Sequence, residues 1–208
     1  AAGHVDSAIA TTSTSNSRFK NGLVNLNFRH SISSLQDIAV DIDWLNYAIR
    51  NEQYFNNELQ ATGGYKEAAQ GYIPAAIKIV SGKIDHTLRF GKNSNLQSGW
   101  KSSHISTDNS ASYQKFDGSI WNEDYGKSNH FLYRENIHAL YSSLETKYKR
   151  FSMQGGLRYE YTAYDAHQLG NAVQKDSAFS RDYSGLFPSA AITSRQILPM
   201  ASHLPPAA

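Results

Sequence analysis

Apolar and polar residues alternate along much of this chain, most clearly between residues 151 and 162. One parity of this segment is apolar and aromatic: Phe151, Met153, Gly155, Leu157, Tyr159 and Tyr161. The other parity is mostly polar or charged: Ser152, Gln154, Gly156, Arg158, Glu160 and Thr162. Because successive side chains of a β-strand point to opposite faces, this pattern predicts a strand with one apolar and one polar face.

The same period of two predicts further strands on either side of this one. We expect seven in all, at residues 22–30, 37–50, 72–90, 96–106, 131–144, 151–164 and 183–197. Pro74 argues against strand structure at the start of the third segment, because proline has no N–H to donate. Short polar turns are expected at 31–36, 91–95 and 145–150. Long irregular connections are expected at 51–71, 107–129 and 165–182.

The regular alternation of short and long connections predicts an all-β, antiparallel up-and-down meander. It favours a partial outer-membrane β-barrel of about seven strands, with one tight rim and one elaborated rim. Strands of about 10 to 14 residues match a tilted membrane crossing better than the five or six usual in soluble sheets. A complete eight-stranded barrel is a weaker possibility, because the last strand is poorly patterned and prolines follow it.

A secreted β-sandwich that binds polysaccharide through its aromatics is the alternative from another class. The two hypotheses make opposite predictions for one set of apolar side chains on the second strand. A barrel exposes them to lipid, whereas a sandwich buries them between two sheets. They are Ile38, Val40, Ile42 and Trp44.

The composition agrees with a membrane barrel and excludes several other classes. The chain is 40% hydrophobic with a mean hydropathy of -0.53, yet it contains 13 Tyr and 9 Phe, as a wet lumen and aromatic girdles require. A net charge of +2 without a basic patch argues against a nucleic-acid partner. The absence of cysteine excludes disulfides, zinc–thiolate sites and a cysteine nucleophile. The sequence contains no run of about 18 apolar residues, so no transmembrane helix is predicted.

The two ends of the chain differ from its middle. Residues 1–17 are small and polar, which predicts a loop, and they do not resemble a signal peptide. Residues 18–197 are expected to form the β-barrel segment. Residues 198–208 contain three prolines and no alternation, so we expect a disordered or non-native tail. Since a barrel protein needs an export signal, the chain is expected to be a middle fragment of a larger barrel.

Charged residues on the polar parities are candidates for a lumen lining. They are Asp37, Asp41 and Asp43 on the second strand, Arg134, Asn136 and His138 on the fifth, and Arg158 and Glu160 on the sixth. They could contact a ligand, or could simply pair across strands in a wet wall for a few tenths of a kcal/mol each. Glu135 falls on the apolar parity, so we expect a bulge to turn it inward.

Aromatic residues divide into two groups by their expected location. An aromatic girdle at the membrane interfaces explains the first group: Trp44, Trp100, Tyr133, Tyr159 and Tyr161. The second group lies in the long connection at 107–129, where a girdle is no explanation. Candidate ligand contacts there are Tyr113, Phe116, Trp121 and Tyr125, and on the strands Arg134 and Arg158.

Neither catalysis nor a cofactor is indicated by the sequence. There is no nucleophile elbow, no His-Glu-x-x-His and no glycine-rich phosphate loop. Asp41 and Asp43 have a spacing that a glycosidase pair could use, but no cleft-forming context accompanies them. His130 and His138 are eight residues apart with no carboxylate at ligand spacing, so no metal site is predicted.

Four sequence blocks resemble the outer-membrane β-barrel family related to TonB-dependent receptors. One pairs an aromatic-x-Tyr-x-Glu-Asn-Ile-x-Ala strand with a Gly-Leu-Arg-x-Glu-x-Thr strand. The matching positions are Phe131, Tyr133, Glu135, Asn136, Ile137 and Ala139, then Gly156, Leu157, Arg158, Glu160 and Thr162. The family's paired upstream strands resemble segment 82–88, which contains Lys83 and Asp85, and segment 98–103, which contains Gly99 and Lys101. Its Leu-Phe-Pro-Ser strand start resembles Leu186 to Ser189.

This resemblance implies the wall of a receptor in the Gram-negative outer membrane. In such receptors about twenty-two strands surround a plug domain, which an inner-membrane complex moves through TonB. The implied partners are therefore membrane lipid, a plug domain, TonB and a nutrient of unknown identity. The present chain lacks a plug, a TonB box and most of the strands, so its own transport competence does not follow.

Overall fold

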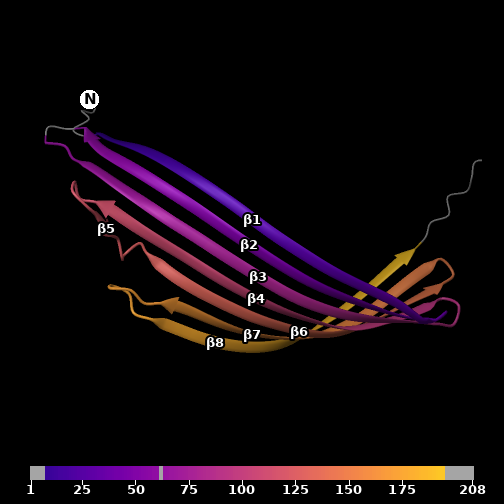
Figure 1. Ribbon diagram of the computed structural model, residues 1–208. Coiled ribbons are helices and arrows are strands. Elements are labelled where there is room, and N and C mark those ends of the chain that lie inside the picture. The colour runs from indigo at the N-terminus through magenta and orange to yellow at the C-terminus, as the bar shows by residue number, and fades with distance from the viewer. Residues whose placement is uncertain (1–7, 61–62, 195–208) are drawn as a thin grey trace, which may run out of the picture.

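The computed structural model describes residues 8–60 and 63–194, and these residues form one curved antiparallel sheet (Figure 1). The strands are β1 (Ala8–Ser33), β2 (Gln36–Gln60), β3 (Lys66–Phe90), β4 (Ser94–Phe116), β5 (Trp121–Glu123), β6 (Asn129–Tyr148), β7 (Phe151–Leu169) and β8 (Ser177–Ser194). The seven long strands pair in chain order, and short β5 pairs with β4. The predicted all-β meander of about seven strands is confirmed.

Each strand pairs with its neighbour over nearly its full length, and the ladders keep a constant register. A shift occurs at Ser31/Ser33, beside the β1–β2 turn. One row of residues therefore crosses all seven long strands in direct cross-strand pairs. It consists of Phe28, Val40, Ile84, Trp100, Leu140, Tyr159 and Leu186. All seven are apolar or aromatic, so we call the face that carries this row the outer face.

A single layer of sheet leaves this protein almost without a hydrophobic core. Among the described residues, Ala139 and Ala166 are the buried apolar ones. On β2, Ile42 is 47% exposed and Trp44 is 43% exposed. A sandwich would bury these side chains between two sheets, so the sandwich alternative is wrong. The described residues also contain no helix long and apolar enough to cross a membrane.

The connections alternate in length as predicted, but they are shorter than expected. One rim carries the tight turns at 34–35, 91–93 and 149–150, where Gly91 and Lys149 adopt positive φ angles of 60° and 52°. The other rim, here called the loop rim, carries the connection from β2 to β3 and those at 117–128 and 170–176. The predicted long connections 51–71, 107–129 and 165–182 are wrong in extent, because most of their residues continue the strands.

The predicted N-terminal loop 1–17 is wrong for residues 8–17, which form the first part of β1 and pair with residues 51–60 of β2. Polar side chains support this pairing: the hydroxyls of Thr11 and Ser15 donate to the amide oxygens of Asn57 and Asn51, at 2.9 and 3.0 Å. A strand that is polar on both faces shows no alternation, which is why the sequence suggested a loop. Residues 1–7 and the predicted tail 198–208 lie outside the described residues.

Pro74 lies inside β3, so the expectation that it argues against a strand there is also wrong. Pro74 pairs with Arg50 on the β2 side. On the β4 side the recorded pairs stop at Tyr72–Ser112 and resume at Ala75–Asn109. Proline has no N–H to contribute to a ladder, and the strand accommodates it by this local interruption.

The strands are longer than one membrane crossing needs. The 25 residues of β2 span about 80 Å at roughly 3.3 Å per residue, whereas about 9 to 11 tilted residues cross a bilayer. The outer apolar residues of β2 end at Trp44, so its second half extends beyond the hydrocarbon toward the loop rim. The outward-facing residues of a strand are therefore expected to be apolar only in the half nearer the tight turns.

A charge on the outer row tests this assignment. Val40→Arg would place a guanidinium in hydrocarbon, and we expect it to destabilise the protein by roughly 2–4 kcal/mol. The measurement is the free energy of unfolding by urea in lipid vesicles. Asn56→Arg is the matched control, because Asn56 lies on the same strand and face but near the loop rim. Equal stability of the two variants would contradict the lipid-facing assignment.

Candidate functional site

The face opposite the outer row carries a chain of charged and polar side chains. Along β2 the positions on this face, such as Asp41 and Asp43, are less exposed than Ile42 and Trp44, as expected on the concave side of a curved sheet. We call it the inner face. Lys83 lies 3.3 Å from Asp41 and 2.9 Å from Asp85, so one ammonium bridges two carboxylates. Asp85 is only 8% exposed.

Tyr141 connects this group to the next strands. Its hydroxyl donates to Asp85 Oδ1 at 2.5 Å, although 56 residues separate the two in sequence. Asp85, Gly99 and Tyr141 occupy one register row on β3, β4 and β6. A Cβ on Gly99 would lie 2.5 Å from the tyrosine ring and hydroxyl. The tyrosine therefore reaches the carboxylate by lying across a glycine, where no side chain blocks it.

Arg158 and Glu160 extend the chain to β7. The guanidinium of Arg158 lies 2.8 Å from Glu160 and 5.7 Å from the centroid of the Tyr141 ring. At the opposite end the amide of Asn27 on β1 donates to Asp41. Together these residues form what we call the inner polar network: Asn27, Asp41, Lys83, Asp85, Tyr141, Arg158 and Glu160. Its charges are largely paired with one another, as charges of reduced exposure must be.

The expected inward carboxylates of β2 are on this face. Asp41 belongs to the network, Asp43 accepts hydrogen bonds from Asn25 at 2.6 Å and Ser81 at 3.0 Å, and Asp37 pairs with Arg89. Lys83, Asp85 and Tyr141 were missed as site residues. The first two could have been found, because they alternate with Ile84 in GKIDHTL, but Tyr141 could not, since its role depends on the register.

Toward the loop rim the inner face becomes largely apolar, with Glu135 as a charged residue among the apolar ones. Between the network and the rim lies what we call the inner apolar patch: Leu45, Tyr47, Ile77, Ile79, Ile105, Tyr133, Tyr164 and Phe179. The ring of Tyr164 packs on Tyr133 at 5.8 Å and on Phe179 at 6.1 Å between centroids. This patch lies on the same face of the sheet as the inner polar network.

The expected inward direction of Arg134, Asn136 and His138 is wrong. The unshifted β6 ladders put them on the outer face with Leu140, and put Glu135 and Tyr133 on the inner face. No bulge is needed for Glu135, and Tyr133 is not an outer girdle residue. Apolar parity alone does not identify the outer face on β6, because the ladders put His138 in the register row of Ile42 and Asn136 in that of Trp44.

The four candidate aromatics of the region 107–129 are not brought together. Tyr113 lies on the inner face against Gly71, where a Cβ would come within 2.6 Å of its ring. Phe116 and Trp121 lie on the outer face, with ring centroids 5.3 Å apart. Tyr125 lies in the connection after β5, and its carbonyl accepts from Asn171. Within the part of the chain that the structure describes, no group of three or more His, Asp or Glu could hold a metal ion.

A curved single-layer sheet with an apolar row across its outer face and a charge-paired network on its inner face has the features of the wall of an outer-membrane β-barrel. Residues 30–196 match the model of the outer membrane protein beta-barrel family, which is well over half of the chain. The chain belongs to this family and is a protein of the Gram-negative outer membrane.

Two solved receptors share its fold. One is the siderophore receptor PiuA from Acinetobacter baumannii, with 8% identity over 92% of this chain and 43% of that chain, at a TM-score of 0.53. The other is the ferric-catecholate import receptor Fiu from E. coli K12, with 11% identity, 85% and 32% coverage, and a TM-score of 0.54. The chain thus spans less than half the length of either receptor. A search of curated protein sequences found no match.

The Tyr141–Asp85 contact gives a test of the network. Gly99→Ala would displace the tyrosine, and we expect a loss of about 1.5–3 kcal/mol, the range for hydrogen bonds to charged groups. The free energy of unfolding in detergent micelles measures this loss. Gly82→Ala is the control, since a Cβ on Gly82 meets nothing within 4 Å. Equal losses of stability in the two variants would show that Gly99 does not act by leaving room for the Tyr141–Asp85 hydrogen bond.

The connection that positions β5 gives a test by pH. The backbone N–H groups of Ile120 and Ser119 donate to Asp117, and the amide of Asn122 donates to it as well, which lowers the pKa of Asp117 from 3.8. Because the folded-state pKa is the lower one, this stabilisation is fully present above pH 3.8 and is lost as the pH falls through the lowered value.

We expect carboxyl NMR of the protein in micelles to give a midpoint for Asp117 below 3.8. Asn122→Ala removes one donor and should move the midpoint upward. A midpoint at or above 3.8 in the unmodified protein would show that the turn does not hold the carboxylate in this way.

Proposed function

We propose that this chain forms part of the wall of an outer-membrane receptor of the TonB-dependent type, which binds and imports a nutrient. The observation that carries the proposal is the inner face, where a charge-paired network and an apolar patch follow one another along the same strands. In a water-filled pore this apolar patch would be unfavourable, because each Å² of apolar surface exposed to water costs about 25 cal/mol relative to burial.

A folded plug domain is the partner that this inner face fits best. Such a domain could cover the inner apolar patch with its own apolar residues. It could also hydrogen-bond to the inner polar network, whose exposed edges offer carboxylate oxygens and the Arg158 guanidinium. TonB would act on that domain, and through it on the contact with the wall.

Further strands complete the wall in this proposal. Within the described residues, β1 and β8 each pair on one side only. Hydrocarbon does not tolerate unpaired backbone N–H and C=O groups, so additional strands must pair with both edges in the membrane. Membrane lipid then contacts the outer row on all sides.

The nutrient contacts are proposed on the inner face and in the loop rim. Of the candidate residues, Tyr113 and Arg158 lie on the inner face and Tyr125 lies in the loop rim, whereas Phe116, Trp121 and Arg134 are on the outer face. The first three are therefore the proposed contacts. PiuA is named as a siderophore receptor and Fiu as a ferric-catecholate receptor, so an iron-loaded catecholate is the first nutrient to test.

Uptake of a radioactive iron-loaded catecholate by cells that depend on the complete receptor tests this function. We expect uptake that requires the proton-motive force and that falls about tenfold in Arg158→Gln, equivalent to a loss of roughly 1.4 kcal/mol of binding. Arg134→Gln is the matched control, because it removes the same charge from the outer face of the neighbouring strand.

Equal uptake by the two variants would contradict a role for the inner face. Uptake unchanged by deletion of the receptor would contradict the nutrient class. The amount of each variant in the outer membrane is measured in parallel, so that a loss of protein is not read as a loss of binding.

A further inference from the structure

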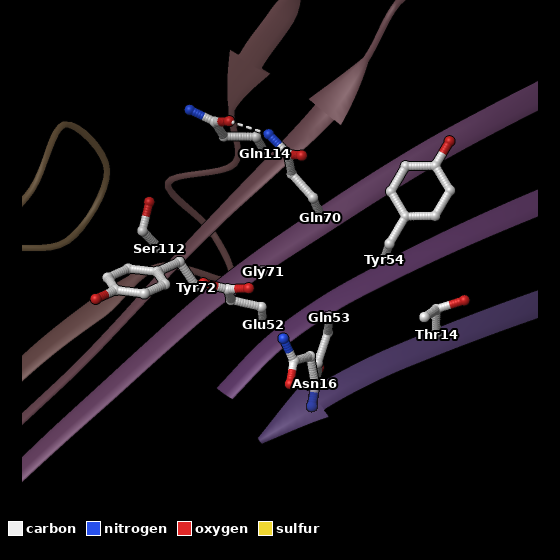
Figure 2. Close-up of a pocket in the computed structure, with 10 residues that line it drawn as sticks. All are labelled: Thr14, Asn16, Glu52, Gln53, Tyr54, Gln70, Gly71, Tyr72, Ser112 and Gln114. Carbon is white, nitrogen blue, oxygen red and sulfur yellow. Dashed lines mark hydrogen bonds between the residues drawn. The ribbon is translucent and has the colours of Figure 1, made fainter. Parts of the chain in front are cut away.

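An open cavity of about 510 Å³ lies over the strands near the loop rim, away from the inner face described above. Its lining comes from β1, β2, β3 and β4, and Figure 2 labels its residues. Tyr54 on β2 pairs with Gln70 on β3, and Gln70 pairs in turn with Gln114 on β4 (Figure 2). Tyr72 lies in the next register row of β3, opposite Glu52. Glu52 completes the part of the lining that can form strong hydrogen bonds.

The register assigns this cavity to the outer face. Tyr54 and Glu52 have the same parity on β2 as Val40 and Trp44, and neither ladder of β2 shifts between these positions. Tyr54 lies ten residues beyond Trp44, about 33 Å along the strand, or roughly 25 Å along the membrane normal at a typical tilt. The cavity therefore looks outward from the wall, above the hydrocarbon.

The aromatic rings are held open to a ligand. Tyr54 is 44% exposed and Tyr72 is 41% exposed, although both are large and partly apolar. Trp121 packs edge-on against Tyr54, with 6.3 Å between centroids, which limits the motion of that ring. An exposed ring with a fixed orientation can stack against the apolar C–H face of a flat ligand.

Hydrogen bonds also fix the orientation of the Gln70 and Gln114 side-chain amides. Gln70 donates to the Gln114 carbonyl at 2.7 Å, and Gln114 donates to Glu123 at 2.5 Å. Each amide keeps further donor or acceptor capacity after these bonds. Within the described residues the Glu52 side chain has no recorded hydrogen bond or ion pair, so both of its oxygens are available to accept. Closely spaced hydroxyl groups are the ligand chemistry that such acceptors and donors suit.

The charge of the cavity excludes other ligand classes. Its lining contains no Lys, Arg or His, and Glu52 is its one carboxylate. Within the lining, a phosphate or carboxylate ligand would meet a like charge and no cation to pair with, and the nearest outer-face cations are Arg18 and Arg50 in the next register row. A neutral ring with several hydroxyls and an apolar face meets no such penalty. This description fits a sugar.

We propose that this cavity binds a neutral sugar ring of the glycolipid that surrounds the barrel in the outer leaflet. The outward direction favours a component of the membrane over a nutrient bound for the lumen, and the height above the apolar band matches headgroup sugars rather than acyl chains. The site is separate from the proposed uptake function, and either could hold without the other.

Saturation-transfer NMR on the protein in detergent micelles tests the site with two probes. One is the dephosphorylated core oligosaccharide of lipopolysaccharide, and the other is maltoheptaose, a soluble glucan. We expect transfer to ring protons of the core oligosaccharide, reduced at least about fivefold in Tyr72→Ala and retained in Tyr72→Phe, which keeps the stacking ring. Tyr148→Ala is the control, since Tyr148 is an exposed tyrosine at the opposite rim.

Each other outcome overturns the proposal in whole or in part. Maltoheptaose bound more tightly than the core oligosaccharide, with the same dependence on Tyr72, would overturn the glycolipid as occupant. Transfer that is absent for both probes, or equal in Tyr72→Ala and Tyr148→Ala, would overturn the site itself. Heat-dependent electrophoretic mobility establishes that every variant compared is folded.

Discussion

Backbone hydrogen bonding between neighbouring strands is the constraint on which this structure depends. Hydrocarbon offers no water to an N–H or C=O group, so each strand in the membrane must be paired by its neighbours. Within the described residues β2, β3, β4, β6 and β7 are paired on both sides by ladders that keep their register beyond the turn at Ser31/Ser33, whereas β1 and β8 are paired on one side. With an unshifted ladder, the parity of a residue decides its face along the whole strand, so the two faces continue far beyond the bilayer.

The environment of each face changes along the strands while the faces themselves do not. Near the tight turns the outer face carries the apolar row and the inner face carries charges such as Asp41 and Lys83. Near the loop rim the inner face becomes apolar at Ile77 and Tyr133, and the outer face becomes polar at Gln70 and Gln114. This reversal explains why Glu135 needs no bulge and why a polar cavity lies on the outer face of the wall.

Side-chain contacts across strands take the place of a core in this single-layer sheet. In the inner polar network Lys83 neutralises two carboxylates, and Tyr141 gives Asp85 a further donor. Such a network is stable only while its members remain paired, because removing one leaves a charge of low exposure without a partner. Its geometry depends on Gly99, whose missing side chain leaves room for the tyrosine ring.

The sequence by itself determined most of the strands, and the faces of β2, β3 and β7 in the membrane half, because side-chain direction follows locally from a period of two. The alternations at 37–44 and 151–162 were sufficient for this, as was the one that contains Lys83 and Asp85. It could not reveal that residues 8–17 and 51–60 are strands, since segments polar on both faces show no period. Only the tertiary structure decided which face Arg134 occupies and that Tyr141 meets Asp85. Both depend on the register between strands and on where each strand leaves the hydrocarbon, which no local pattern encodes.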